Sequence, residues 1–143
     1  MKRPAIITAL AFAISVLFVY AALIKVMDYS FFVANLRKSP LLANYNMHVL
    51  APVVLGIEML AAVLLNIAAV RRAGFYLSFF VMLTFTLYLV VLYYFYKNIP
   101  CACGGILGMM PYPVHIVFNI VFTLMAMMGV LLDSRQRHSR AAA

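Results

Sequence analysis

Residues 5–27 read AIITALAFAISVLFVYAALIKVM, an apolar run with one charged side chain, Lys25. At about 1.5 Å rise per residue, a helix over this run spans roughly 30 Å, the thickness of the hydrocarbon core of a bilayer. A secretory signal peptide is the rival interpretation, because the basic pair Lys2-Arg3 precedes the run. The run is longer than a usual signal-peptide core, and Lys25 lies near its end, where basic residues anchor membrane spans. The sequence therefore favours a retained transmembrane helix.

Three further apolar runs have the length of membrane spans. They cover about residues 47–70, 73–96 and 114–132, and the outer loops of the chain cover residues 28–46 and 97–113. The chain of 143 residues is 68% hydrophobic and 10% charged, which is more apolar than a soluble domain of this size could bury. Because a backbone inside lipid must satisfy its own hydrogen bonds, the sequence predicts an all-α membrane protein. We expect a single membrane domain over residues 1–143, folded as an up-down bundle of four transmembrane helices.

The basic residues indicate how the bundle is oriented. The chain has 11 Lys and Arg against 3 acidic residues, a net charge of +8, and no soluble basic domain that would bind nucleic acid. Four spans put both termini on one side. That side holds seven basic residues, Lys2, Arg3, Arg71, Arg72, Arg135, Arg137 and Arg140, and the other holds four, Lys25, Arg37, Lys38 and Lys97. The positive-inside rule therefore predicts cytoplasmic termini and, in the inner (cytoplasmic) membrane of a bacterium, a periplasmic loop at residues 97–113.

The outer loop at residues 28–46 contains a candidate surface element. Asp28 can cap a short interfacial helix, which would lay Phe31, Phe32 and Leu36 on the membrane surface. A plain connecting loop is the alternative interpretation of this segment.

The only two cysteines lie in the other outer loop, as Cys101-Ala102-Cys103-Gly104-Gly105. A disulfide between residues two apart is near the upper end of the allowed Cα separation, so it is expected to be strained and easily reduced. Such a disulfide closes almost no loop and adds little stability, which favours redox chemistry over structural bracing. An inert local disulfide or a reduced pair is the alternative.

A metal site is a weaker alternative for the same loop. Cys101 and Cys103 with Met109, Met110 or His115 would supply soft ligands that suit Cu(I). Zinc needs four ligands, which the loop supplies only with His115 and a donor from outside it. We therefore expect no metal.

Five polar residues inside the spans or at their ends are candidate binding residues. Glu58 lies near the middle of the second span, where a carboxylate must be protonated, paired or directed at a polar cavity. Lys25, near the outer end of the first span, can extend to the interface or reach an acid or carbonyl of another helix. His48 and His115 lie at the outer ends of the second and fourth spans, where each can bind a quinone oxygen, activate a thiol or simply be interfacial. Asn119, one turn from His115, can cross-link helices or contact a bound ring.

Three features in order along the chain are typical of one family. The first span ends in LIKVMD (residues 23–28), the second carries Pro52 ahead of Glu58, and a Cys-x-Cys-x-Gly loop precedes the fourth. In these features, which extend over nearly its whole length, the chain resembles the MauE family within the wider DoxX-like group. The cysteine loop is the most specific part, although Gly104 stands where the family's usual loop has an aromatic residue.

The resemblance implies a membrane thiol–disulfide oxidoreductase associated with methylamine utilisation, linked to a quinone in the manner of DsbB and vitamin K epoxide reductase. Cys101 and Cys103 are then expected to exchange electrons with a periplasmic thioredoxin-like or cysteine-containing substrate protein, one thiolate attacking and the other resolving the mixed disulfide. Those enzymes use more than one cysteine pair, so the partner must supply the second dithiol. Electrons are expected to pass to ubiquinone or menaquinone between the helices, near Lys25, His48, Glu58, His115 and Asn119. The alternative is a non-catalytic assembly or structural subunit of a membrane complex, and a Cu(I)-thiolate protein is a weaker one.

Overall fold

The computed structural model describes residues 2–96 and 105–143, and all regular structure in these residues is helical. The helices are α1 (Lys2–Met27), α2 (Tyr29–Lys38), α3 (Met47–Asn66), α4 (Arg71–Phe95), α5 (Gly105–Met109) and α6 (Tyr112–Ala141). Four of them, α1, α3, α4 and α6, are long and apolar enough to cross a membrane. The prediction of an all-α membrane protein with four spans is confirmed.

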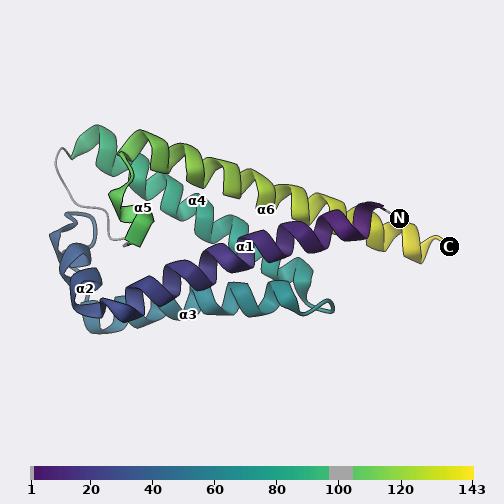
Figure 1. Cartoon of the computed structure of the whole chain (residues 1–143), viewed down its shortest axis with the longest axis horizontal. Coiled ribbons are helices and arrows are strands. Elements are labelled where there is room, and N and C mark those ends of the chain that lie inside the picture. The colour runs from purple at the N-terminus through teal and green to yellow at the C-terminus, as the bar shows by residue number, and fades with distance from the viewer. Residues whose placement is uncertain (1, 97–104) are drawn as a thin grey trace.

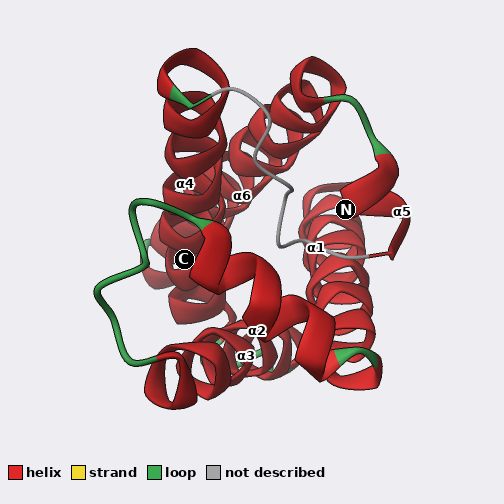
Figure 2. Cartoon of the chain, turned by 90° about the vertical axis from the view of Figure 1, so that its left-hand side faces the viewer, coloured by secondary structure: helices red, strands yellow, loops and turns green. Residues whose placement is uncertain are grey.

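The four long helices run up and down as an antiparallel bundle (Figure 1). The main contacts are those of α1 with α3, α3 with α4, α4 with α6 and α6 with α1, which gives the order of the helices around the bundle. Figure 2 looks along the bundle and shows α2 lying across its near end. Both chain termini lie at the opposite end, as four spans require (Figure 1). We call these the α2 end and the termini end.

The core forms where large side chains of one helix meet small side chains of another. Phe18, Leu65 and Phe75 are fully or almost fully buried, and alanines of α1, α3 and α6 pack among them. Small residues let helix backbones approach closely, which is how helices associate in lipid. Other large apolar side chains point outwards, such as Phe12 and Phe80, which are 65% and 58% exposed. These outward side chains are expected to face lipid.

Two glycines mark the closest helix contacts. A Cβ atom added at Gly74, in the first turn of α4, would lie 2.7 Å from the backbone nitrogen of Leu65 at the end of α3. A Cβ atom at Gly129 of α6 would overlap the ring of Phe75. In contrast, a Cβ atom at Gly56 of α3 would have nothing within 4 Å. The packing therefore requires glycine at the first two positions and not at the third.

Gly74→Ala is expected to lower the free energy of unfolding by about 1–3 kcal/mol, because backbone atoms of α3 and α4 would have to move apart. The matched control is Gly56→Ala, which should be neutral or stabilise by up to about 1 kcal/mol because alanine is the better helix former. Thermal unfolding in one detergent compares the two variants. Equal midpoints would contradict the close α3–α4 approach.

The turn between α3 and α4 differs from its predicted limits. The helix α3 ends at Asn66 instead of near residue 70, and α4 begins at Arg71 instead of residue 73. Asn66 Nδ2 donates to the carbonyl oxygen of Ala62 at 2.7 Å, and Arg71 Nε donates to that of Leu65 at 3.0 Å. The Leu65 carbonyl is one of the four that a helix end leaves without intrahelical partners, and Arg71 satisfies it, while Asn66 adds a side-chain bond one turn earlier. Hydropathy, on which the predicted limits were based, does not reveal such bonds.

The last helix, α6, continues to Ala141, well beyond the predicted span limit at residue 132. Arg137 Nε donates to Asp133 Oδ2, one turn earlier, at 3.1 Å. Arg137 Nη2 also donates to the carbonyl oxygen of Ala69, in the turn between α3 and α4, at 3.2 Å. These bonds hold the polar end of α6 in helical form after the apolar span is complete.

The capped helix predicted after Asp28 is present as α2. Asp28 Oδ1 accepts a hydrogen bond from the Phe31 backbone N–H at 3.3 Å. The prediction that its apolar side chains lie on the membrane surface was wrong for Phe32 and Leu36, which are buried in a cluster with Met47 of α3. Of the three residues, Phe31 does point outwards, being 52% exposed. The helix α2 faces inward because the following loop brings the start of α3 beneath it.

Candidate functional site

A buried ion pair joins α1 to α3. Lys25, in the last turn of α1, donates from Nζ to Oε1 of Glu58, near the middle of α3. The two side chains are 4% and 2% exposed. An unpaired charge at this depth would be costly, so each group lowers the free-energy cost of burying the other. Of the alternatives that the sequence left open for Lys25, the structure shows contact with an acid of another helix.

The surroundings of the pair are aromatic on the side of Lys25, and on the side of Glu58 one carboxylate oxygen is left without a described partner. Lys25 Nζ lies 5.5 Å from the ring centroid of Phe32 and 5.2 Å from that of Phe85, within the range of cation–π interactions. Glu58 Oε2 is buried and has no hydrogen-bond partner in the part of the chain that the structure describes. A buried oxygen without a partner needs an explanation, and a functional role is one.

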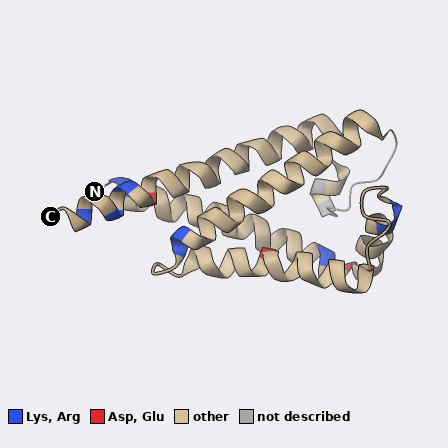
Figure 3. Cartoon of the chain, turned by 180° about the vertical axis from the view of Figure 1, so that it is seen from behind, with Lys and Arg blue, Asp and Glu red and all other residues tan. Residues whose placement is uncertain are grey.

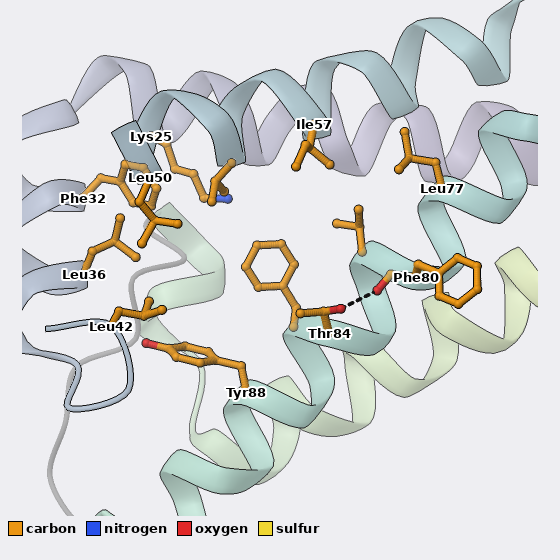
Figure 4. A pocket seen from close by; sticks show the side chains of 13 residues that line it. Lys25, Phe32, Leu36, Leu42, Leu50, Ile57, Leu77, Phe80, Thr84 and Tyr88 are labelled. Atoms are coloured by element: carbon orange, nitrogen blue, oxygen red, sulfur yellow. Dashed lines mark hydrogen bonds between the residues drawn. The ribbon is translucent and has the colours of Figure 1, made fainter. Parts of the chain in front are cut away.

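A cavity of about 370 Å³ begins at Lys25 and extends between α3 and α4. Its wall is mostly apolar and is formed by Phe32, Leu36, Leu42, Leu50, Val54, Ile57, Leu77, Phe80, Val81 and Phe85. Figure 4 shows the Lys25 nitrogen directed into this space and Tyr88 of α4 across it. The Thr84 hydroxyl, also at the wall, donates to the carbonyl oxygen of Phe80 at 2.8 Å. Because Ile57 and Phe80 are 37% and 58% exposed, the cavity borders the lipid-facing surface.

Three other predicted binding residues lie away from this cavity. His48 is exposed in the first turn of α3, where its backbone N–H donates to Asn46 Oδ1 at 3.0 Å. His115 and Asn119 are both buried, one turn apart on one face of α6. As far as the structure describes the chain, the cavity lining includes none of the three. Of the five predicted binding residues, the structure pairs Lys25 with Glu58 and places Lys25 alone in the lining of the cavity.

The predicted redox residues, Cys101 and Cys103, lie outside the described residues. The described chain starts again at α5, two residues after Cys103. The Ile106 N–H donates to the hydroxyl of Tyr20 on α1 at 3.1 Å. This bond attaches α5 to α1, and Figure 1 shows α5 in the half of the bundle nearer α2.

The donors predicted for a copper site differ in exposure. Met109, at the end of α5, is 85% exposed, whereas His115 is 2% exposed. Within residues 2–96 and 105–143, no group of three or more His, Cys, Asp or Glu side chains gathers in a way that could hold a metal ion. The copper alternative therefore depends on the two cysteines.

The α4 wall of the cavity was missed in the sequence analysis. Thr84, Phe85 and Tyr88 reach the cavity from one face of α4, together with Leu77, Phe80 and Val81. These positions follow the spacing of three and four residues that places side chains on one side of a helix. The available signal was a helical stripe with two hydroxyl groups, Thr84 and Tyr88, in an otherwise apolar face.

Four antiparallel membrane helices, a buried Lys–Glu pair and a cavity beside lipid define a small multi-pass membrane protein with a candidate binding site near one end of its bundle. The family model described as methylamine utilisation protein MauE matches residues 3–132, which include all four apolar spans and both cysteines. The chain therefore belongs to the MauE family, which confirms the resemblance seen in the sequence. No curated protein and no solved structure matches the chain.

Proposed function

We propose that this protein is a thiol–disulfide oxidoreductase of the bacterial inner membrane. Cys101 and Cys103 exchange electrons with a periplasmic thioredoxin-like or cysteine-containing protein, and a quinone bound at Lys25 is the acceptor. The observation that carries the proposal is the cavity at Lys25, an apolar space beside lipid with an ammonium group in its wall. The family description connects the protein with methylamine utilisation, and the thiol partner is part of the proposal.

The residues around the cavity fit a quinone. The volume of the cavity, about 370 Å³, lies in the range of small-molecule sites, roughly 300–1,000 Å³. The apolar wall suits a ring and the start of an isoprenoid tail, and the opening between α3 and α4 lets the rest of the tail stay in lipid. Lys25 Nζ would bind one quinone oxygen, and the Tyr88 side chain lies across the cavity (Figure 4). When bound, a quinone supplies an acceptor for two electrons and two protons.

Glu58 has two tasks in this proposal. Its Oε1 holds Lys25 Nζ at the cavity, where a lysine side chain would otherwise extend to the interface. Its Oε2, which has no partner among the described residues, is available to hold a proton close to the ammonium group. Glu58 is thus a positioning residue for Lys25, with capacity for proton transfer.

Thiol exchange proceeds by two nucleophilic displacements. A partner thiolate attacks one sulfur of the Cys101–Cys103 disulfide, and the other sulfur leaves as a thiolate. The second partner thiolate then attacks the mixed disulfide, so the partner departs as a disulfide and both cysteines are reduced. The partner has lost two electrons, which the cysteine pair passes on with two protons when it returns to the disulfide.

The charge distribution supports a periplasmic α2 end. Figure 3 shows Lys and Arg gathered at the termini end, with a smaller group at α2. Among the described residues, the α2 end carries Arg37 and Lys38, because Lys25 is buried in the ion pair. The seven basic residues at the termini end then favour a cytoplasmic location more strongly than the sequence count did. The periplasm is also the compartment in which disulfides persist.

In the Thr84→Phe variant, the rate of ubiquinone-1 reduction is expected to fall about tenfold or more below that of the wild type, because the added ring fills the cavity. The reaction is followed by quinone absorbance, with purified protein whose cysteines have been reduced. The matched control is Leu87→Phe on the same helix, because Leu87 is 57% exposed and does not line the cavity. This control should retain the wild-type rate.

A second measurement separates the cavity from the cysteines. Exchange between the cysteine pair and glutathione, followed by thiol trapping, is expected to be unchanged in both variants. If Thr84→Phe reduces ubiquinone-1 as fast as Leu87→Phe, the cavity at Lys25 is not the quinone site.

A further inference from the structure

A second cavity, of about 480 Å³, lies at the termini end of the bundle, far from the candidate site. It is formed where the first turns of α1, the α3–α4 turn and the polar end of α6 meet. Arg71, Arg137 and Arg140 line it, together with a single acidic residue, Asp133. Three cations and one anion give the lining a net charge of +2. The cavity therefore favours an anionic ligand.

Two of these arginines are held in place by bonds to the surrounding helices. Arg71 donates from Nε to the carbonyl oxygen of Leu65 at 3.0 Å and from Nη1 to Thr8 Oγ1 at 3.3 Å. Arg137 donates from Nε to Asp133 Oδ2 at 3.1 Å and from Nη2 to the Ala69 carbonyl oxygen at 3.2 Å. A guanidinium group has five N–H donors, so these bonds leave further donors on each side chain. Fixed guanidinium groups bind phosphate oxygens well because little side-chain conformational freedom is lost on binding.

The mixed lining of the cavity points to a lipid. It includes Pro4 and Ile7, in the first turns of an apolar helix that is long enough to cross the membrane, and Ile7 belongs to the buried core. Its basic residues come from the polar ends of the helices, so apolar and basic side chains meet where a membrane span ends, which is the level expected for lipid headgroups. Basic pockets between transmembrane helices on the cytoplasmic side suit anionic headgroups. We propose that this cavity binds the phosphate of an anionic phospholipid.

The test uses the full-length protein in detergent, titrated with dioleoylphosphatidylglycerol or with dioleoylphosphatidylcholine. We expect the anionic lipid to raise the thermal unfolding midpoint and to remain bound in native mass spectrometry, and the zwitterionic lipid to do neither. Arg140→Gln should weaken binding of the anionic lipid about tenfold, through loss of a charge-assisted hydrogen bond. Arg135→Gln is the matched control, since Arg135 is exposed on the same helix and does not line the cavity.

The two variants remove the same charge from exposed positions, so unfolding without lipid should show equal midpoints. Equal binding of the two lipids, or unchanged binding in Arg140→Gln, would overturn the proposal. A comparison of inorganic phosphate with chloride at equal ionic strength tests whether the cavity binds free phosphate instead of a lipid headgroup. If phosphate alone raises the wild-type midpoint as much as the anionic lipid, and Arg140→Gln removes both effects, the site takes free phosphate and the lipid assignment is overturned.

Discussion

Lys25→Met is expected to lower the free energy of unfolding by about 3–5 kcal/mol. Methionine keeps much of the apolar length of the side chain, but the Glu58 carboxylate, 2% exposed, loses its cation. Glu58→Met is expected to cost less, because Lys25 would keep the rings of Phe32 and Phe85 at 5.5 and 5.2 Å from Nζ. Denaturant unfolding in one detergent measures both variants.

The double variant Lys25→Met/Glu58→Met should recover most of the loss, because it removes both buried charges together. The control is Arg137→Met, which breaks the pair with Asp133 in which the arginine is 48% exposed. Fully exposed pairs contribute about 0–1 kcal/mol, and this partly exposed pair is expected to contribute less than the buried Lys25–Glu58 pair. If Lys25→Met cost no more than Arg137→Met, the buried pair would not hold α1 to α3, and the proposed role of Glu58 would fail.

The variant with both Cys101→Ser and Cys103→Ser is expected to lose thiol–disulfide exchange completely and to unfold at the wild-type temperature. Exchange needs two sulfur atoms, whereas a disulfide between residues two apart adds little stability by closing a loop. In wild-type membranes equilibrated across glutathione ratios, thiol trapping should show a reversible disulfide. Its potential should lie well above about −300 mV, the upper limit for structural disulfides.

The cysteine measurement also distinguishes the alternatives. A pair that stays reduced at every glutathione ratio, or that never becomes reduced, would contradict the oxidoreductase. Restored growth of a deletion strain by the double-serine variant would favour an assembly subunit in which the cysteines are incidental. Copper that co-purifies with the wild type and is absent from that variant would favour a Cu(I)-thiolate protein.

Hydropathy predicted the four spans because a membrane imposes one strong requirement on the chain. Each span must be apolar over about the thickness of the bilayer and must satisfy its own backbone hydrogen bonds, so it is helical. The span limits were less accurate, since α3 ends where the Asn66 and Arg71 side chains bond carbonyl groups of its last two turns. The Asp28 cap of α2 could be predicted because a cap depends on neighbours in the sequence. The burial of Phe32 could not, because it depends on where α3 packs.

The candidate site was partly predictable for the same reason. Lys25 and Glu58 stood out as charged residues in apolar runs, where a charge needs an explanation. Their pairing did not follow from the sequence, because they are 33 residues apart on different helices. Tyr88 belongs to the site through the position of α4 beside α3, and His48 does not line the cavity because the first turn of α3 leaves it exposed.

By itself, the sequence determined that this is a four-span helical membrane protein of the MauE type with one cysteine pair between its last two spans. Length, hydropathy and motif spacing carry that information because each span must meet the requirements of the bilayer locally. Only the tertiary structure decided that Lys25 pairs with Glu58, that α2 places the ring of Phe32 beside Lys25, and that one cavity opens beside lipid while another gathers arginines at the termini end. These features depend on which helix faces pack together, and small residues help to set that packing: Gly74 where α4 meets the preceding helix α3, and Gly129 where α6 meets Phe75 of α4, 54 positions earlier in the sequence.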